Sequence, residues 1–268
     1  MSTFLFDEII FGPVRSRRLG VSLGINLLPV GCKYCNFDCI YCECGRNIIS
    51  TSLNDRTTSL PTRSEIYAAL EHKLIAMQLV ETRHATSLQP DTITFAGNGE
   101  PTIHPEFAGI IDDTVSLRNR YAPQSKVSVL TNATMLHRHE VVEALKKTDL
   151  PILKLDSAFD ATINLLNQPS KKMCASQLIE QLQLFGKQCI IQTMFVQGTF
   201  FGKTVDNTTP VELDAYERAI LSIRPAQVMI YTIARNTPVD TLRKVSGDTL
   251  RIIAGRIERH GIMVQVSE

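Results

Sequence analysis

The feature that most constrains the fold is an alternation of short β-branched runs with longer helical patterns. The predicted strands cover residues 19–27, 91–97, 126–132, 152–157, 189–196, 227–233 and 262–266. The predicted helices cover 61–80, 105–119, 137–147, 171–186, 211–223 and 246–259. Strands that alternate with helices in this way lie parallel and are joined by right-handed crossovers. The sequence therefore predicts an α/β fold, a partial (β/α)6 barrel of the TIM type with parallel strands and outer helices.

The length and composition are those of one globular domain. The 268 residues are close to the roughly 250 of a full eight-fold barrel, and a six-stranded partial barrel suits them better. No linker rich in Gly, Ser or Pro divides the chain, so we expect a single domain over 1–268. The barrel should occupy about 19–260, after a short N-terminal extension at 1–18. The polar, glycine-bearing stretch 197–210 is interpreted either as a loop that covers the substrate or as an ordinary surface loop.

The charge balance bears on partners and location. The chain has 28 basic and 27 acidic residues. Proteins that grip long nucleic acid usually carry a larger basic excess, so a nucleic-acid partner is allowed but not favoured. No run approaches the roughly 18–20 apolar residues of a membrane span. The first residues lack the basic region of a secretory signal, so we expect a cytoplasmic protein with no membrane partner.

The cysteines are the strongest chemical signal, because five of the seven lie between residues 32 and 44. Such a cluster without an export signal favours metal or redox chemistry over disulfides. Cys35, Cys39 and Cys42, spaced C-x-x-x-C-x-x-C, offer three thiolates to a four-iron cluster that normally takes four, which leaves one iron open. Structural zinc is the alternative, but Cys32-x-x-Cys35 and Cys39-x-x-Cys42 lie closer together than the roughly dozen residues that usually separate such pairs. The spacing of these cysteines does not match the order of the cysteines in a ferredoxin.

Polar residues follow several predicted strands at the point where each ends. In parallel α/β folds these carboxyl ends meet at one rim and form the ligand site. The cysteine loop follows the first strand, so it should lie at the same rim. The other residues expected there are Asn98, Gly99, Glu100, Asn132, Asp156, Ser157, Tyr231 and Arg235.

The cysteine loop, with Tyr41 before its last cysteine, resembles the defining motif of the radical S-adenosylmethionine (radical SAM) superfamily. Asn98-Gly99-Glu100-Pro101 is similar to that superfamily's Gly-Gly-Glu-Pro motif. Four stretches are similar to a small single-cluster branch near the wybutosine-synthesis enzymes: FGPVRSRRLGVSLGINLLPVG, CNFDCIYCECG, FAGNGEPTIHPEF and the segment from LKLDS to LLNQP. The resemblance covers most of the chain.

The resemblance implies a 4Fe-4S cluster on Cys35, Cys39 and Cys42, with S-adenosylmethionine (SAM) bound to the open iron. An electron delivered to the cluster would split SAM into methionine and a deoxyadenosyl radical, which abstracts hydrogen from a substrate. Tyr41 would pack near the adenine, and Gly99 would let the backbone approach the methionine.

Further contacts follow from the same resemblance. Glu100 would accept a hydrogen bond from the amino group of SAM. Asn98 stands where the family has glycine, so either it adopts a positive φ or the contact differs. Asp156 and Ser157 occupy the place where the family often binds the ribose, and Asn132 is a further candidate for cofactor binding.

Several residues have no assigned role. No catalytic residue is identified, and Arg235, Tyr231 and Arg17 are candidates for contacts with the substrate or SAM. The run Arg15, Arg17 and Arg18 is interpreted either as a clamp for a phosphate or carboxylate or as a solvated surface. Cys32 and Cys44 are spare thiols, a second redox pair, neighbours of the cluster or a fourth ligand. We favour spare thiols or neighbours.

The substrate is not identified by the sequence. We expect a small molecule and a reductant such as flavodoxin or ferredoxin. The alternatives are an enzyme that modifies a tRNA base, as in wybutosine synthesis, and an activase of a glycyl-radical enzyme. The third alternative is an iron–sulfur or zinc protein that is not an enzyme. The chain lacks the further N-terminal cysteines of the archaeal wybutosine enzymes, which disfavours a tRNA substrate.

Overall fold

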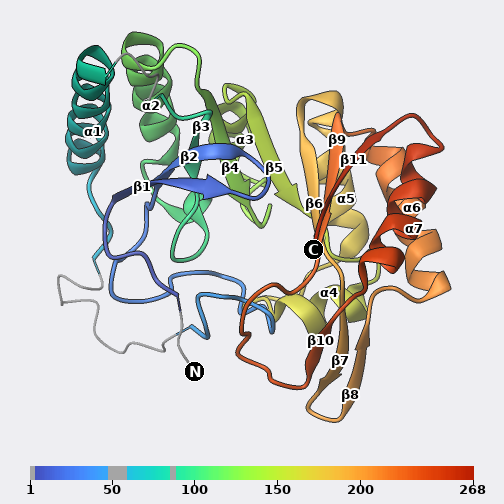
Figure 1. The fold of residues 1–268 in the computed structure, drawn as a ribbon. Coiled ribbons are helices and arrows are strands. Elements are labelled where there is room, and N and C mark those ends of the chain that lie inside the picture. The colour runs from blue at the N-terminus through green and yellow to red at the C-terminus, as the bar shows by residue number, and fades with distance from the viewer. Residues whose placement is uncertain (1–3, 48–58, 85–88) are drawn as a thin grey trace.

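A computed structural model describes residues 4–47, 59–84 and 89–268 of the protein. Its centre is a curled eight-stranded sheet with the spatial order β1-β2-β3-β4-β5-β6-β9-β11 (Figure 1). Strand β1 runs antiparallel to β2, and every other neighbouring pair is parallel. The strands are β1 Ile10–Ser16, β2 Gly20–Ile25, β3 Thr92–Phe95, β4 Lys126–Thr131, β5 Leu150–Lys154, β6 Ile190–Met194, β9 Gln227–Tyr231 and β11 Met263–Ser267.

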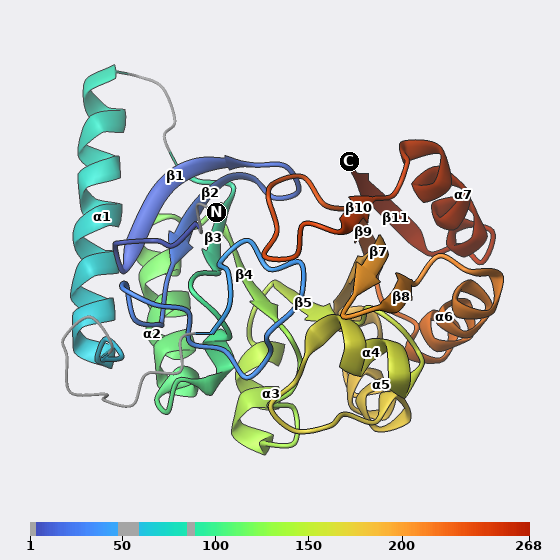
Figure 2. The same ribbon diagram turned by 90° about the horizontal axis from the view of Figure 1, so that it is seen from below.

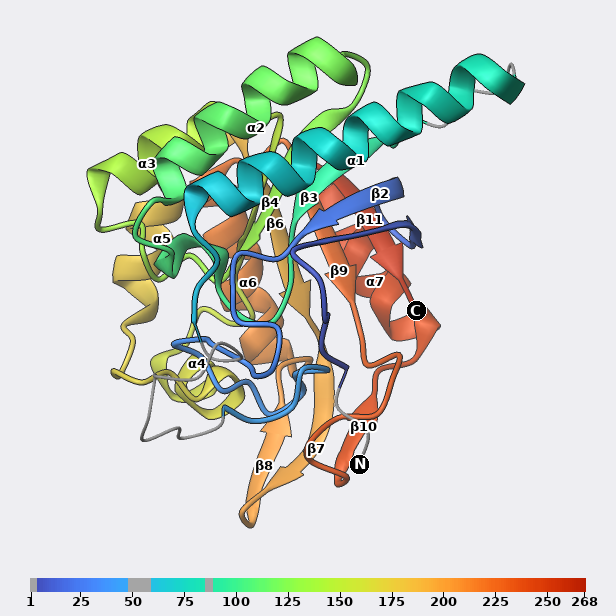
Figure 3. The ribbon, with the colours of Figure 1, turned by 90° about the vertical axis from the view of Figure 1, so that its left-hand side faces the viewer.

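Helices cover the outer face of this sheet (Figures 1 and 3). They are α1 Arg63–His84, α2 Phe107–Tyr121, α3 His139–Lys146, α5 Ala175–Gln183, α6 Pro210–Ile223 and α7 Gly247–Glu258. A further helix, α4 Asp160–Asn167, lies beyond the carboxyl ends of the strands. The outward side chains of the central strands, such as Phe95 and Val129, are fully buried under these helices in one hydrophobic core. The half-barrel with outer helices confirms the predicted fold class. Among the described residues, no helix is long and apolar enough to cross a membrane.

The start of α1 follows the local sequence signal. The backbone N–H of Thr62 donates to Glu65 Oε2 at 2.7 Å, and Thr62 Oγ1 accepts from the Glu65 N–H at 3.3 Å. These two bonds form the predicted capping box, which satisfies backbone donors that the first helical turn leaves free. His104 links this point to α2, because its ring accepts from the Glu106 N–H and also contacts Pro61 O.

Four segments differ from the sequence-based expectation. The predicted extension 1–18 contributes strand β1, and helix α4 was not predicted. The predicted helix 171–186 is reduced to α5. The stretch interpreted as a covering loop forms the hairpin of β7 Val196–Phe200 and β8 Lys203–Asp206, to which β10 Leu242–Lys244 adds a third strand. This hairpin projects beyond the barrel (Figure 3).

The inner face of the sheet is a mixture of polar and apolar side chains. The hydroxyls of Ser22, Thr94 and Ser128 are hydrogen-bonded to one another across β2, β3 and β4. The turn between β1 and β2 reaches the opposite edge of the sheet, where Gln265 Nε2 of β11 donates to Arg18 O at 3.3 Å. Leu19 in this turn packs on inward residues of β5, β6 and β9. The turn therefore closes the inner space at the amino ends of the strands.

Candidate metal centre

The cysteine loop lies across the carboxyl ends of the strands (Figure 2). On one side Tyr34 forms a bridge with Gly99, in which Tyr34 N donates to Asn98 O at 2.7 Å and Glu100 N donates to Tyr34 O at 3.2 Å. On the other side Ile40 N donates to Leu166 O at 2.9 Å, at the end of α4. The loop is therefore docked between the end of β3 and α4 through its backbone.

Each of the three predicted ligand cysteines contacts a hydrogen-bond donor. Asn132 Nδ2 lies 3.8 Å from Cys35 Sγ, and the Phe37 N–H lies 3.4 Å from the same sulfur. Asn167 Nδ2 lies 3.4 Å from Cys39 Sγ. Cys42 lies beside the Cys44 thiol and the Lys33 ammonium, both of which lower its pKa. Donors of this kind stabilise thiolates and tune the potential of clusters that thiolates hold.

Lys33 supplies positive charge beside these thiols. Its side chain is buried, and its ammonium donates to Asp38 Oδ1 at 3.1 Å and Gly45 O at 3.0 Å. Burial lowers the pKa of Lys33, but the negative charges of the ligand cysteines and Asp38 outweigh burial, so this pKa is raised. The lysine therefore stays protonated, and nothing in the sequence analysis singled it out.

The thiols differ in acidity. The hydrogen bond from Cys44, with a smaller contribution from Lys33, lowers the pKa of Cys42 to about 6. Burial raises the pKa of Cys39 to about 11, and burial also raises that of Cys35. Binding of a metal releases the proton from such a thiol. Buried thiols with N–H donors and a nearby ammonium fit a group that is bound by thiolates.

All seven cysteines are free thiols. Among the residues that the structure describes, no three His, Cys, Asp or Glu side chains converge as they would around a single metal ion. A four-iron cluster takes each cysteine on a different iron, so its ligands are spread around it. Cys32 and Cys44 both lie in the same loop, and Cys44 Sγ donates to Gly97 O at 3.6 Å.

The Glu100 carboxylate accepts most of the hydrogen bonds in the polar network beside the cysteine loop. It is buried and accepts from the Thr102 N–H at 3.0 Å, the Thr102 hydroxyl at 2.5 Å, the Thr131 hydroxyl at 2.6 Å and the Asn132 N–H at 2.6 Å. Burial raises the pKa of Glu100, although these hydrogen bonds oppose the rise. Through Asn132, which also contacts Cys35, the carboxylate connects the end of β4 to the cysteine loop.

Gly99 can only be glycine here. Its φ is +147°, and a Cβ would lie 1.9 Å from the carbonyl oxygen of Tyr34. The backbone of the cysteine loop therefore approaches this position more closely than any side chain would permit.

Asn98 has a different role from the one expected at a cofactor contact. Its φ is not positive, and its buried side chain pairs with the N-terminal segment. The amide oxygen accepts from the Phe6 N–H at 2.8 Å, and the amide nitrogen donates to Phe6 O at 2.8 Å and to Pro29 O at 2.9 Å. Of the two interpretations of Asn98, the structure supports the one in which the contact differs.

A second network joins Asp156 to the loop. The Tyr41 hydroxyl donates to Asp156 Oδ2, and Asn167 Nδ2 donates to the same oxygen at 2.7 Å. Oδ1 accepts from the Met194 N–H at 2.9 Å and faces Lys154 Nζ at 3.4 Å. Lys154 and Asn167 were missed by the sequence analysis. A lysine inside the apolar run ILKLDS was the available signal for the first.

The remaining candidates are dispersed. The Ser157 hydroxyl donates to Glu212 Oε2 at 2.6 Å and is buried against α6, away from the cysteine loop. Tyr231 lies on the inner face, where its hydroxyl accepts from Lys154 Nζ at 3.3 Å. Arg235 pairs with Glu43 at 2.6 Å on the surface, and Arg17 is exposed in the β1–β2 turn.

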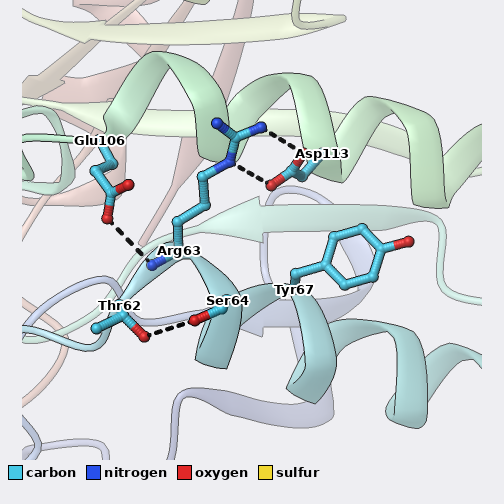
Figure 4. Close-up of a pocket in the computed structure, with 6 residues that line it drawn as sticks. All are labelled: Thr62, Arg63, Ser64, Tyr67, Glu106 and Asp113. Atoms are coloured by element: carbon cyan, nitrogen blue, oxygen red, sulfur yellow. Dashed lines mark hydrogen bonds and ion pairs between the residues drawn. The ribbon is translucent and has the colours of Figure 1, made fainter.

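A separate hollow of about 500 Å³ lies on the outer side of the barrel, between the start of α1 and α2 (Figure 4). Arg63 and Asp113 form a two-point ion pair there, at 2.6 and 2.8 Å. The Arg63 N–H also contacts Glu106, and Thr62 belongs to the capping box. These polar groups are satisfied by one another, so the hollow is a feature of helix packing and not part of the candidate site.

Comparison with known proteins connects this site to a family. A family model described as the Radical SAM superfamily matches residues 30–184, which include the cysteine loop and the ends of β3, β4 and β5. A protein of Brachyspira hyodysenteriae named GTPase Obg is 28% identical over 90% of this chain and 32% of its own length. A UPF0026 protein of Methanocaldococcus jannaschii is 31% identical over 66% of this chain and 49% of its own length. The chain thus spans half or less of these two relatives.

Solved structures share the fold. A radical SAM methyltransferase from Sphaerobacter thermophilus has a TM-score of 0.63 at 14% identity, covering 92% of this chain and 65% of that one. SuiB of Streptococcus suis, in a structure with bound S-adenosylmethionine, has a TM-score of 0.58 at 14% identity, covering 91% of this chain and 50% of that one. At this identity the likeness concerns the fold.

Proposed function

The chain belongs to the radical SAM superfamily, and from this premise we propose that it holds a 4Fe-4S cluster on Cys35, Cys39 and Cys42 and cleaves SAM. A reduced cluster of this kind, when bound with SAM, supplies the electron that splits SAM into methionine and a deoxyadenosyl radical, which removes hydrogen from a substrate. One observation carries the proposal: three thiols on one docked loop each contact a hydrogen-bond donor and share the charge of Lys33.

The residues around the thiols would hold the thiolate charge. Asn132 and Asn167 each direct a side-chain N–H at a ligand sulfur from outside the loop. Lys33 adds a buried positive charge within it. Because the ends of β4 and α4 carry the two asparagines, the sulfurs keep their donors only while the loop stays docked. The fold therefore supports a site that is formed before a cofactor arrives.

Glu100 is proposed to bind the amino group of SAM. A carboxylate has about four lone-pair positions. Three donors from Thr102 and Thr131 converge on Oε1, whereas Oε2 accepts only the Asn132 N–H. One position on Oε2 is therefore left for a further donor. An ammonium group there would make a charge-assisted bond and favour the ionised carboxylate, against the effect of burial.

Tyr41 and Asp156 are proposed to fix the adenosine side of the site. The Tyr41 ring is held by the bond from its hydroxyl to Asp156, and Asn167 braces the same carboxylate oxygen. A ring locked in this way presents a constant face to an adenine. We propose no direct cofactor contact for the side chains of Asn98 and Ser157, because both are bound elsewhere in the protein.

The wider context of the activity is also a proposal. One hydrophobic core runs from Ile10 to Ile257, which supports a single domain over residues 1–268. A reductant such as flavodoxin or ferredoxin would supply the electron, and the cytoplasm is the compartment in which free thiols persist.

The test is anaerobic reconstitution with iron and sulfide, followed by SAM and a chemical reductant. The wild-type chain should form deoxyadenosine and methionine in equal amounts, and Cys39→Ala should form neither. Cys32→Ala and Cys44→Ala are the matched controls and should retain the cluster, measured as iron and sulfide per chain. The proposal fails if the wild type makes no deoxyadenosine above background. The ligand assignment fails if the controls lose the cluster while Cys39→Ala keeps it.

A further inference from the structure

The side chain of Arg18 is a cationic group on the inner face with no acidic partner among the residues that the structure describes. Its guanidinium lies over the ring of Tyr231, with Cζ 4.6 Å from the ring centroid. The Nη1 atom is buried and has no hydrogen-bond partner. Among the described residues, none of the ion pairs involves Arg18. A buried donor without an acceptor is destabilising, and more so when the group is charged.

A second cation lies against the same tyrosine. Lys154 Nζ donates to the Tyr231 hydroxyl at 3.3 Å and lies 5.8 Å from the centre of its ring. A lysine ammonium has only donors, so the Tyr231 oxygen must be the acceptor and its own proton is free to be donated elsewhere. Arg18, Lys154 and Tyr231 therefore direct three kinds of donor into one small region.

The acid that pairs with Lys154 has no position left for a second cation. Asp156 faces Lys154 at 3.4 Å, and its two oxygens also accept from the Tyr41 hydroxyl, from Asn167 and from the Met194 N–H. Its lone-pair positions are thereby filled.

The region lies next to the cysteine loop. Lys154 Nζ is 5.2 Å from the centre of the Tyr41 ring, and Tyr41 is next to Cys42. The same ammonium lies 3.4 Å from Asp156 Oδ1, just after the end of β5. The β1–β2 turn, which carries Arg18, closes the far end.

We propose that Arg18, Lys154 and Tyr231 form a subsite that binds an oxyanion of the substrate, either a carboxylate or a phosphate. The inference rests on the proposed function, since it concerns the substrate of the same site. A guanidinium offers a planar fork that matches both groups, and the ammonium and the hydroxyl complete their coordination. The oxyanion anchors the substrate at the closed end, with the rest of the molecule pointing towards the cysteine loop.

The geometry also decides between the two interpretations of the basic run. Arg15 and Arg17 are exposed, whereas Arg18 turns inwards onto Tyr231. Of the three arginines, only Arg18 belongs to the proposed subsite.

Calorimetric titration of the full chain with inorganic phosphate and with malonate tests the inference, without reductant or turnover. At least one probe should bind the wild type with about millimolar affinity, and Arg18→Gln should weaken it by at least about tenfold. Tyr231→Phe, which removes only the hydroxyl, should weaken it less. Arg120→Gln is the matched control, because Arg120 also stacks on a tyrosine but is exposed at the end of α2; it should bind the probe as the wild type does. The preferred probe identifies the substrate group.

Three results would overturn the inference. They are no binding of either probe, equal binding by the wild type and Arg18→Gln, and a parallel loss of SAM affinity in Arg18→Gln, since the last would make this a SAM contact. Thermal midpoints of each variant show that the fold persists. A chain that binds a probe through Arg18 but makes no deoxyadenosine would refute the proposed function and not this subsite, whereas deoxyadenosine without probe binding would refute the subsite alone.

Discussion

At the scale of single residues, Asn98 shows how one side chain can replace a strand partner. Its amide both accepts from and donates to the backbone of Phe6, as a neighbouring strand would, and it reaches Pro29 as well. A glycine at this position could make none of these bonds. The Asn98 amide therefore binds the N-terminal segment to the rim of the barrel, next to the glycine that receives the cysteine loop, in addition to the bond from Phe4 N to Glu43 O.

Replacing this amide should cost stability and leave the chemistry intact. Asn98→Ala removes three hydrogen bonds from partly buried backbone groups, so the free energy of unfolding should fall by about 2–3 kcal/mol. Iron content after reconstitution should match the wild type. Urea unfolding measures the free energy of unfolding. Asn119→Ala, on the exposed side of α2, should change stability by less than about 0.5 kcal/mol. Loss of the cluster in a folded Asn98→Ala protein would contradict this account.

At the scale of elements, the site depends on how one loop is docked. Gly99 permits the backbone of β3 to contact that of Tyr34, and the end of α4 holds the other side of the loop through Leu166. These contacts are between backbones, so they fix the path of the loop irrespective of most of its side chains. The cysteines acquire their donors as a consequence of this docking.

Gly99→Ala should undock the loop. The added Cβ would lie 1.9 Å from Tyr34 O, so the loop must move and the unfolding free energy should fall by about 2–4 kcal/mol. Iron bound after reconstitution should fall as well. The matched control is Gly255→Ala in α7, where a Cβ meets nothing within 4 Å. This helical substitution should raise stability by about 0.5–1 kcal/mol and leave iron content unchanged. Equal iron content in the two variants would contradict the docking argument.

The pairing of α6 with α7 should make stability depend on pH. Burial would raise the pKa of Glu217, but hydrogen bonds from His260 and Arg256 outweigh it and hold the pKa below its usual 4.5. The unfolded chain therefore binds more protons than the folded one between the two pKa values, and stability falls as the pH drops below about 4.5. Glu217→Gln should flatten this fall in a pH series of urea unfolding. An unchanged slope would show that the contact does not contribute.

At the scale of the whole molecule, the repeated strand–helix units could be predicted from the sequence. The alternation of β-branched and helical segments predicts the parallel strands and their covering helices, because each of these elements is determined by a local pattern. Strand β1 was not predicted because its sequence, IFGPVRS, contains a Gly-Pro pair and a charged residue, Arg15. The hairpin β7–β8 was read as a loop because it is polar and contains glycines. Both segments form antiparallel hairpins, β1 with β2 and β7 with β8, and β10 adds a more distant partner to β7.

The residues of the candidate site also fall into those defined by a local motif and those defined by distant contacts. The cysteines and Gly99 could be predicted because a local motif defines them. Lys154 and Asn167 could not, because their significance lies in contacts with residues far away in the sequence, such as Tyr231 and Cys39. Arg18 was predicted only as one member of a basic run, and its contact with Tyr231 distinguishes it from Arg15 and Arg17. Asn98 and Ser157 match the family pattern by position, yet their side chains serve the fold.

We propose that three cysteines hold the cluster and leave one iron for SAM. Electron–nuclear double resonance on the reduced, reconstituted chain, with SAM labelled at its amino nitrogen, can detect this bond. We expect a hyperfine coupling between the labelled nitrogen and the cluster in the wild type, which persists in Cys32→Ala and Cys44→Ala. A cluster that binds with no such coupling, and that needs a fourth cysteine, would contradict it.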